Sequence, residues 1–158
     1  MCSPRLSANE GPMRAVVQRV AWAKVEVLGE IVGAIEKGLL VYLGVARSDT
    51  AADRAYVLNK IVGLRVFENE AGKMDRSVVD VAGALLLVSQ FTLYGDVRRG
   101  LRPSFDDAMR AEDAELVCDA FVREARAKVP VETGRFRTHM RVSSLNDGPV
   151  TIWIDSAR

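Results

Sequence analysis

The sequence has little of what a metal site or a catalytic triad needs. Its 158 residues include one histidine, His139, and two cysteines, Cys2 and Cys118. Two cysteines are too few for a cysteine zinc site, and a triad or multi-histidine site would have to include His139. Cys2 lies far from Cys118, in a terminal segment where chains are often mobile, so a disulfide framework is not expected. We predict a protein with no metal, no cofactor and no disulfide.

Long apolar runs and an excess of one charge are also absent. No run approaches the ~18 apolar residues of a membrane span, and the first twelve residues have no hydrophobic stretch of a secretory signal. Lysine and arginine number 22 against 21 aspartates and glutamates, so the net charge is +1. We therefore expect a cytoplasmic protein with no membrane partner, in which any contact with nucleic acid depends on local clusters of charge.

What is present fits one globular domain. Hydrophobic residues make up 49% of the chain and charged residues 27%, a balance that supports a buried core. The length fits a single domain. We expect residues 1–12, which are polar and small, to form a disordered extension, and residues 13–158 to form the domain.

Hydrophobic patterning predicts several strands. Alternating residues on either side of a turn at 28–30 are typical of a β-hairpin, whereas the continuous apolar runs 38–45 and 84–88 are typical of strands covered on both faces. A second turn is expected at 146–149. The predicted strands are residues 14–20, 24–27, 31–35, 38–45, 84–88, 140–143 and 150–154.

Two helices are predicted between these strands. The first is expected to begin with Ser48 or Asp49 as N-cap and to end near Gly63. The second spans Ala111–Val129, is amphipathic, and ends before Pro130. This order of elements predicts a mixed α/β single domain, with a curled, barrel-like β-sheet covered by two helices.

The segment Ser89-Gln90-Phe91-Thr92-Leu93 follows a buried strand and brings hydroxyl groups to the place where that strand leaves the core. In an extended chain Ser89 and Thr92 point to opposite sides, so one face presents both hydroxyls only if the strand bulges. The alternative is that these hydroxyls only complete hydrogen bonds at a strand end.

Gly148-Pro149 and two groups of arginines are the other candidate features. Glycine permits unusual backbone angles and a Gly-Pro bond can be cis, although an ordinary trans turn is the alternative. The arginines suit RNA phosphates, and a solvated charged surface is the alternative. They are Arg98, Arg99 and Arg102 in the loop after Thr92, and Arg135, Arg137 and Arg141, which share one face of an expected strand with His139.

In combination, six short motifs resemble the D-aminoacyl-tRNA deacylases from Met13 to about Asp155. Their shared order and separation make a chance match improbable. One segment departs from the pattern, because Arg137 follows Phe136 where glycine or alanine is usual. The motifs are Val-Gln-Arg-Val (17–20), Gly-Leu-Leu-Val with Leu-Gly-Val (38–45), Gly-Lys-Met (72–74), Ser-Gln-Phe-Thr-Leu (89–93), Arg-Pro-Ser-Phe (102–105) and Asn-Asp-Gly-Pro-Val-Thr (146–151).

The resemblance implies a homodimer with its active site at the subunit interface, which removes D-amino acids, and also glycine, from the acceptor end of tRNA. By that resemblance Gly148 and Pro149 form a Gly-cis-Pro motif that enters the partner's pocket and aims two carbonyl oxygens at the substrate. Arg19 holds the motif in place. These residues and Met140 are the set expected for substrate binding and chiral selection.

The resemblance also implies that Ser89, Gln90, Phe91 and Thr92 line the catalytic site, and it leaves two mechanisms open. Thr92 is the nucleophile in one. Water acts with the terminal 2′-hydroxyl of the tRNA in the other, which the residues favour because no histidine or carboxylate adjoins Thr92 in the sequence. Arg98, Arg99 and Arg102 are expected to bind tRNA. Two rival functions remain, a non-catalytic nucleic-acid-binding dimer of the same fold and a purely structural β-rich module.

Overall fold

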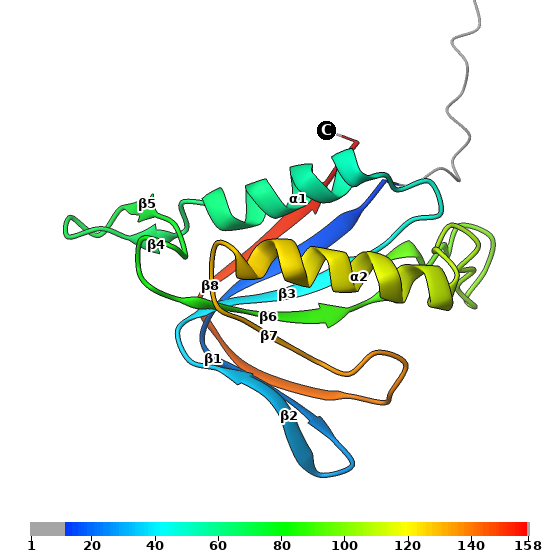
Figure 1. The fold of residues 1–158 in the computed structure, drawn as a ribbon, viewed down its shortest axis with the longest axis horizontal. Helices are drawn as coiled ribbons and strands as arrows, with labels where there is room; N and C mark the ends of the chain where they lie inside the picture. The colour runs from blue at the N-terminus through cyan, green and yellow to red at the C-terminus, as the bar shows by residue number, and fades with distance from the viewer. Residues whose placement is uncertain (1–11, 158) are drawn as a thin grey trace, which may run out of the picture.

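The structure is a computed structural model that describes residues 12–157 (Figure 1). The expectations for Cys2 and for a disordered extension therefore concern residues that, apart from Pro12, lie outside the described part. The elements are β1 (Arg14–Val27), β2 (Glu30–Ile35), β3 (Gly38–Gly44), α1 (Ala51–Gly63), β4 (Phe67–Glu68), β5 (Met74–Arg76), β6 (Ala84–Ser89), the 3-10 helix η1 (Phe91–Tyr94), α2 (Ala111–Arg126), β7 (Val131–Thr133) and β8 (Arg141–Asp155).

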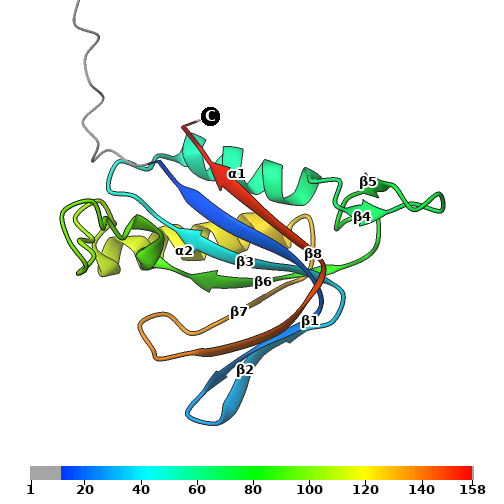
Figure 2. The same cartoon turned by 180° about the vertical axis from the view of Figure 1, so that it is seen from behind.

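The six-stranded sheet is organised around the long strand β1. The order is β2-β1-β3-β6-β7, and β8 pairs with the other side of β1. The first half of β1 pairs with β3 and the second half with β2, while β8 runs antiparallel along both halves. A Cβ on Gly33 of β2 would lie 2.3 Å from the carbonyl oxygen of Thr133 in β7, so the two ends of the sheet nearly meet. The predicted curled sheet is confirmed (Figures 1 and 2).

Both helices lie on one side of the sheet (Figures 1 and 2). Ile61 of α1 and Phe121 of α2 are fully buried in a core that also contains Leu39 of β3 and Leu85 of β6. Burying one side chain of this size stabilises the fold by about 1.5–3 kcal/mol relative to leaving it exposed. A second cluster, which includes Val25, fills the inside of the curl. The end of β6 is therefore held between two packed layers.

The helix boundaries differ slightly from the prediction. Thr50, rather than Ser48 or Asp49, is the N-cap of α1, because its backbone N–H donates to the Asp53 carboxylate in a capping box. Helix α2 ends at Arg126 instead of Val129. None of the helices in residues 12–157 is long and apolar enough to cross a membrane.

Two predicted local structures are wrong. The strand expected to carry Arg135, Arg137 and His139 is a turn between β7 and β8, closed by a hydrogen bond from the Thr138 hydroxyl to the carbonyl of Arg135 at 2.8 Å. Arg137 has φ +60° there, in the left-handed region that side chains other than glycine disfavour. The turn expected at 146–149 is a bulge inside β8, because the ladder with β1 resumes on both sides of it.

Candidate functional site

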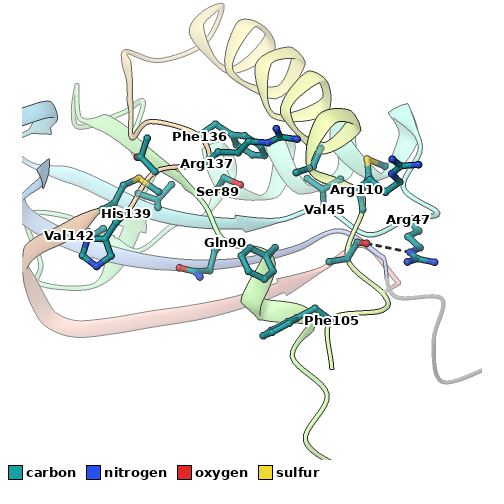
Figure 3. Close-up of a pocket in the computed structure, with 18 residues that line it drawn as sticks. Val45, Arg47, Ser89, Gln90, Phe105, Arg110, Phe136, Arg137, His139 and Val142 are labelled. Carbon is teal, nitrogen blue, oxygen red and sulfur yellow. Dashed lines mark hydrogen bonds between the residues drawn. The ribbon is translucent and has the colours of Figure 1, made fainter. Parts of the chain in front are cut away.

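A pocket of about 590 Å³ opens beside the end of β6, the start of α2 and the turn before β8 (Figure 3). Three phenylalanines, Phe91, Phe105 and Phe136, contribute to its walls. Three arginines from different segments also line it: Arg47 after β3, Arg110 before α2, and Arg137 in the turn before β8. The size suits a nucleoside-sized ligand, and the lining combines aromatic surface with positive charge.

The chain bends sharply where β6 ends, and this bend forms one side of the pocket. The N–H of Gln90 still donates to the Leu43 carbonyl of β3 at 2.8 Å, and the chain then winds into η1. Ser89, Gln90 and Phe91 line the pocket, whereas Thr92 does not. The extended geometry considered for this segment therefore does not occur, because the turn replaces strand alternation.

The turn η1 is held by two polar side chains, half-buried Arg14 at the start of β1 and buried Tyr94. Arg14 donates to the carbonyl of Leu93 at 3.1 Å, and its guanidinium lies 4.9 Å from the ring centroid of Tyr94. The Tyr94 hydroxyl donates to the Gly44 carbonyl at 3.0 Å. Burial raises the pKa of Tyr94 above its usual range, so this hydroxyl keeps its proton and its hydrogen bond. These contacts fix the position of η1 against β1 and β3.

Thr92 is exposed, and its hydroxyl accepts a hydrogen bond from the side-chain amide of Gln90. An amide is not a base at neutral pH, and a threonine nucleophile needs a base to remove its proton. No histidine or carboxylate hydrogen-bonds to Thr92 within residues 12–157. The structure brings Thr92 close to Gln90, but it does not bring a base to Thr92.

Ser89 links the pocket to α2. Its hydroxyl hydrogen-bonds to the thiol of Cys118, whose pKa is raised to about 11, mainly by burial. A thiol with so high a pKa stays protonated and is a poor nucleophile. A smaller cavity of about 230 Å³ lies against Cys118 and shares Ser89, Phe136 and Met140 with the main pocket. Ser89 and Met140 therefore lie between the two cavities.

Arg19 is buried, with 7% of its surface exposed, and it holds two main-chain oxygens. Nη1 donates to the Val66 carbonyl at 2.6 Å and Nε donates to the Asp147 carbonyl at 3.1 Å. Gly148 follows Asp147 with φ +124°, and the Gly148-Pro149 peptide bond is cis. Arg19, Gly148 and Pro149 do not line the pocket of their own chain.

The arginines expected to bind tRNA lie in the loop between η1 and α2. Arg98 forms a two-pronged ion pair with Asp96, with Nη2 2.6 Å from Oδ2. Arg99 and Arg102 are exposed and line a separate polar cavity of about 420 Å³. The charge of Arg98 is thus already partly neutralised inside the loop.

Sequence reasoning missed several residues that the fold brings to the pocket. Phe105 lies in the Arg-Pro-Ser-Phe motif, which indicated the family but did not indicate that Phe105 lines the pocket. Arg47 and Arg110 carry no motif, and both reach the pocket because the segment after β3 packs against the loop before α2. That packing includes the N–H of Met109 donating to the Val45 carbonyl at 2.9 Å. Within residues 12–157 no cluster of three or more histidine, cysteine or acidic side chains is arranged to hold a metal ion.

The fold and the pocket together define a small α/β protein with a pocket of about 590 Å³ whose aromatic walls and arginine side chains suit a nucleotide. Comparison with known proteins narrows this class. Residues 16–155 match the family described as D-Tyr-tRNA(Tyr) deacylase. The chain belongs to this family, and the membership predicted from the motifs is confirmed. A deacylase is a hydrolase of an ester bond, so the predicted enzyme class is confirmed as well.

Individual relatives agree with this assignment. The D-aminoacyl-tRNA deacylase of Sorangium cellulosum is 59% identical over 148 residues, which cover 92% of this chain and 99% of the relative. That of Symbiobacterium thermophilum is 58% identical over 147 residues, 92% of this chain and 97% of the relative. A solved structure of a c-Myc DNA Unwinding Element Binding Protein has a TM-score of 0.86 and 42% identity, covering 90% of this chain and 97% of that one. A probable eukaryotic D-amino acid tRNA deacylase, 18% identical with a TM-score of 0.76, shares the fold over 90% of this chain and 98% of its own.

Proposed function

We propose that this protein hydrolyses the ester bond of D-aminoacyl-tRNA, and of glycyl-tRNA, and releases the free amino acid and tRNA. The observation that carries the proposal is the position of the family's Ser-Gln-Phe-Thr segment, whose first three residues line the pocket of about 590 Å³. The pocket takes the terminal adenosine with its ester, and the acceptor end of the tRNA is the partner. Such a substrate belongs to the cytoplasm.

The start of η1 supplies hydrogen-bond donors for the reaction. A 3-10 turn pairs each N–H with the carbonyl three residues before it, so the first N–H groups, those of Phe91 and Thr92, have no partner within the turn. They are suited to bind the oxyanion that forms on the ester carbonyl oxygen. Each such donor contributes about 10²–10³ in rate, and an aminoacyl ester is already activated, so positioning plus these donors is sufficient.

The reaction itself exchanges one C–O bond for another. Water adds to the ester carbon, and the carbonyl electron pair moves to the oxygen held by the N–H groups. The tetrahedral intermediate then collapses, the bond to the 3′-oxygen of the tRNA breaks, and that oxygen takes up the proton lost by water through the neighbouring 2′-hydroxyl. Thr92 has no base beside it and acts as a positioning group, with the Gln90 amide on its hydroxyl.

Chiral selection in this proposal comes from the partner subunit. Gly148 and Pro149 are exposed on β8 and lie outside the pocket of their own chain, so a second chain is needed to bring them to a substrate. Their carbonyl oxygens meet the ammonium group and α-carbon that all amino acids share, and they exclude the L-side chain sterically. Glycine has no side chain and is therefore not excluded.

The proposed homodimer uses the outer face of β1 and β8. Strand β8 pairs only with β1, so its other edge is unpaired within the described chain. Large apolar side chains are exposed on these two strands, with Trp153 at 52% and Leu145 at 47% on β8 and Trp22 at 40% on β1. An exposed strand edge with apolar residues is typical of a surface that another chain covers.

We also assign tRNA binding to the loop that carries Arg98, Arg99 and Arg102. Exposed arginines add affinity through phosphate contacts without reading the base sequence. Arg99 and Arg102 supply most of this contact, because Arg98 is paired with Asp96.

Matched D- and L-tyrosyl-tRNA test the proposal. We expect rapid release of D-tyrosine only. Binding of both substrates with release of neither would instead support the second candidate, a non-catalytic nucleic-acid-binding dimer. That candidate is favoured by the name of the similar DNA Unwinding Element Binding Protein. Absence of both binding and release would support the structural module.

A further inference from the structure

Arg47, Arg110 and Arg137 place three positive charges along the main pocket, and no acidic residue lines it among the side chains that the structure describes. The polar cavity beside Arg98 is different, because Asp96, Asp106 and Asp107 line it together with the arginines. The main pocket is therefore the more favourable place for an anion, and the arginines reach it from three separate segments (Figure 3).

Arg137 is the most constrained of the three. Its backbone is in the left-handed region at φ +60°, which costs a residue with a side chain roughly 1–2 kcal/mol. The side chain remains 49% exposed and its Nη2 lies 3.1 Å from Oε1 of Glu112 in the first turn of α2. Strained backbone that presents an accessible charged group beside a pocket is a common feature of ligand-binding sites.

The Arg137 guanidinium is paired with the Glu112 carboxylate. The backbone N–H of Glu112 and then the guanidinium of Arg137 lower the pKa of this carboxyl, so Glu112 is ionised at neutral pH. Nε of Arg110 lies 4.0 Å from the same carboxylate. Both partners are exposed, and exposed ion pairs of this kind are weak. A phosphate can therefore displace Glu112 from the Arg137 guanidinium at a low cost in free energy. The guanidinium can bind the phosphate through two parallel hydrogen bonds.

We propose that Arg137, assisted by Arg110 and Arg47, binds the phosphate groups that precede the terminal adenosine of the acceptor end. Arg137 is in this proposal a positioning residue that discriminates in favour of an ester on an RNA chain over the same ester on a free nucleoside. The inference rests on the proposed function, since it assigns the phosphates of the same substrate.

Two model substrates distinguish phosphate binding by Arg137 from hydrolysis of the ester bond itself. D-tyrosyl adenosine has no phosphate, whereas the D-tyrosyl ester of the trinucleotide CCA has two phosphodiesters. For Arg137→Gly, which suits the left-handed backbone, we expect kcat/KM to fall about tenfold on the trinucleotide, mainly through KM, and to be unchanged on the adenosine ester. The slope of log KM against log salt should fall by about 0.7 on the trinucleotide.

Arg137→Lys and Arg135→Ala complete the design. Lysine keeps the charge, so it should restore part of the preference for the trinucleotide. Arg135 is exposed, lies two residues away in the same turn and lines the smaller cavity instead of the main one, so Arg135→Ala should behave as the wild type on both substrates. If the wild type cleaves both esters and Arg137→Gly changes both rates equally or neither, this inference fails while the proposed function stands. If the wild type cleaves neither ester, both fail.

Discussion

Arg19 and Gly148 lie so close together that a Cβ on Gly148 would come within 2.9 Å of Arg19 Nη2. The guanidinium therefore packs against the main chain of the Gly148-Pro149 segment, in addition to its hydrogen bond with the Asp147 carbonyl. Its second acceptor, the Val66 carbonyl, precedes β4. One buried side chain thus fixes the bulge of β8 relative to the region between α1 and β4.

Replacing Arg19 should loosen the proposed chiral filter. In Arg19→Ala the carbonyls of Val66 and Asp147 lose their charged donor, which should cost about 1–3 kcal/mol of unfolding free energy. The measurement is the ratio of kcat/KM for D- and L-tyrosyl-tRNA, which we expect to fall about tenfold or more. Arg65→Ala, an exposed arginine, is the control. An unchanged ratio would remove Arg19 from the selection mechanism.

Adding a methyl group at Gly148 should disturb the same Gly148-Pro149 segment directly. The residue has φ +124°, and an added Cβ would also lie 3.0 Å from Cγ2 of Val150. Gly148→Ala should therefore destabilise the protein by about 1–3 kcal/mol and reduce discrimination against L-tyrosyl-tRNA. Gly63→Ala is the matched control, because its Cβ would meet no atom within 4 Å. Urea unfolding and the two rate constants test both effects, and identical behaviour of the two variants would contradict the prediction.

The sequence predicted the central strands well because their apolar runs are long and bounded by glycine, as in Gly38–Val45. It could not predict the turn at 134–140, since alternation of Arg135, Arg137 and His139 is compatible with a strand, and only the packed structure shows Arg137 in a left-handed conformation. The bulge at 146–149 looks like a turn locally. It becomes part of β8 because β1 is long enough to pair with both of its sides.

The sequence predicted only those pocket residues that lie next to one another within a motif. Ser89, Gln90 and Phe91 are adjacent in sequence and line the pocket together. Arg47 and Arg110 are far apart in sequence, and both line the pocket because the segment after β3 contacts the loop before α2. Periodicity contains no information about such contacts, so these residues could not have been found without the fold.

Thr92→Ala should retain most of the activity. The hydroxyl is exposed and contacts only an amide, so its loss should lower the single-turnover rate by no more than about tenfold, the size of a positioning effect. The backbone N–H of residue 92 remains in the variant. Rapid mixing with D-tyrosyl-tRNA measures the rate directly. A fall to the rate of the uncatalysed ester would contradict this prediction and would support either a hydroxyl nucleophile or an essential hydrogen bond of the Thr92 hydroxyl.

A charge at the exposed apolar face of β8 should separate the proposed dimer. Leu145→Glu places a carboxylate opposite Trp22, its partner across the strand pair, and burying an unpaired charge in an interface costs several kcal/mol. We expect a monomer by light scattering and loss of D-tyrosyl-tRNA hydrolysis. Leu116→Glu, on the exposed face of α2 with 68% exposure, should remain a dimer. A monomeric wild type, or a dimeric Leu145→Glu that is fully active, would contradict the proposed interface.

The carboxyl of Asp49 should make stability depend on pH. Burial raises its pKa to about 7, and this effect exceeds the lowering by the hydrogen bond from the Ala46 N–H. The nearby charges of Asp53 and Asp155 raise the pKa further, and a hydrogen bond from the Met13 backbone lowers it. The unfolded chain releases this proton near pH 4, so between pH 4 and 7 the folded protein binds more protons and its stability falls as the pH rises. Because the group is only partly buried, we expect a loss of about 1–2 kcal/mol, complete above pH 7. Urea midpoints at pH 5 and 8 measure it. Asp49→Asn should lack this difference while Asp106→Asn, on an exposed loop, keeps it, and parallel curves for Asp49→Asn and the wild type would show that the pKa of Asp49 is not raised.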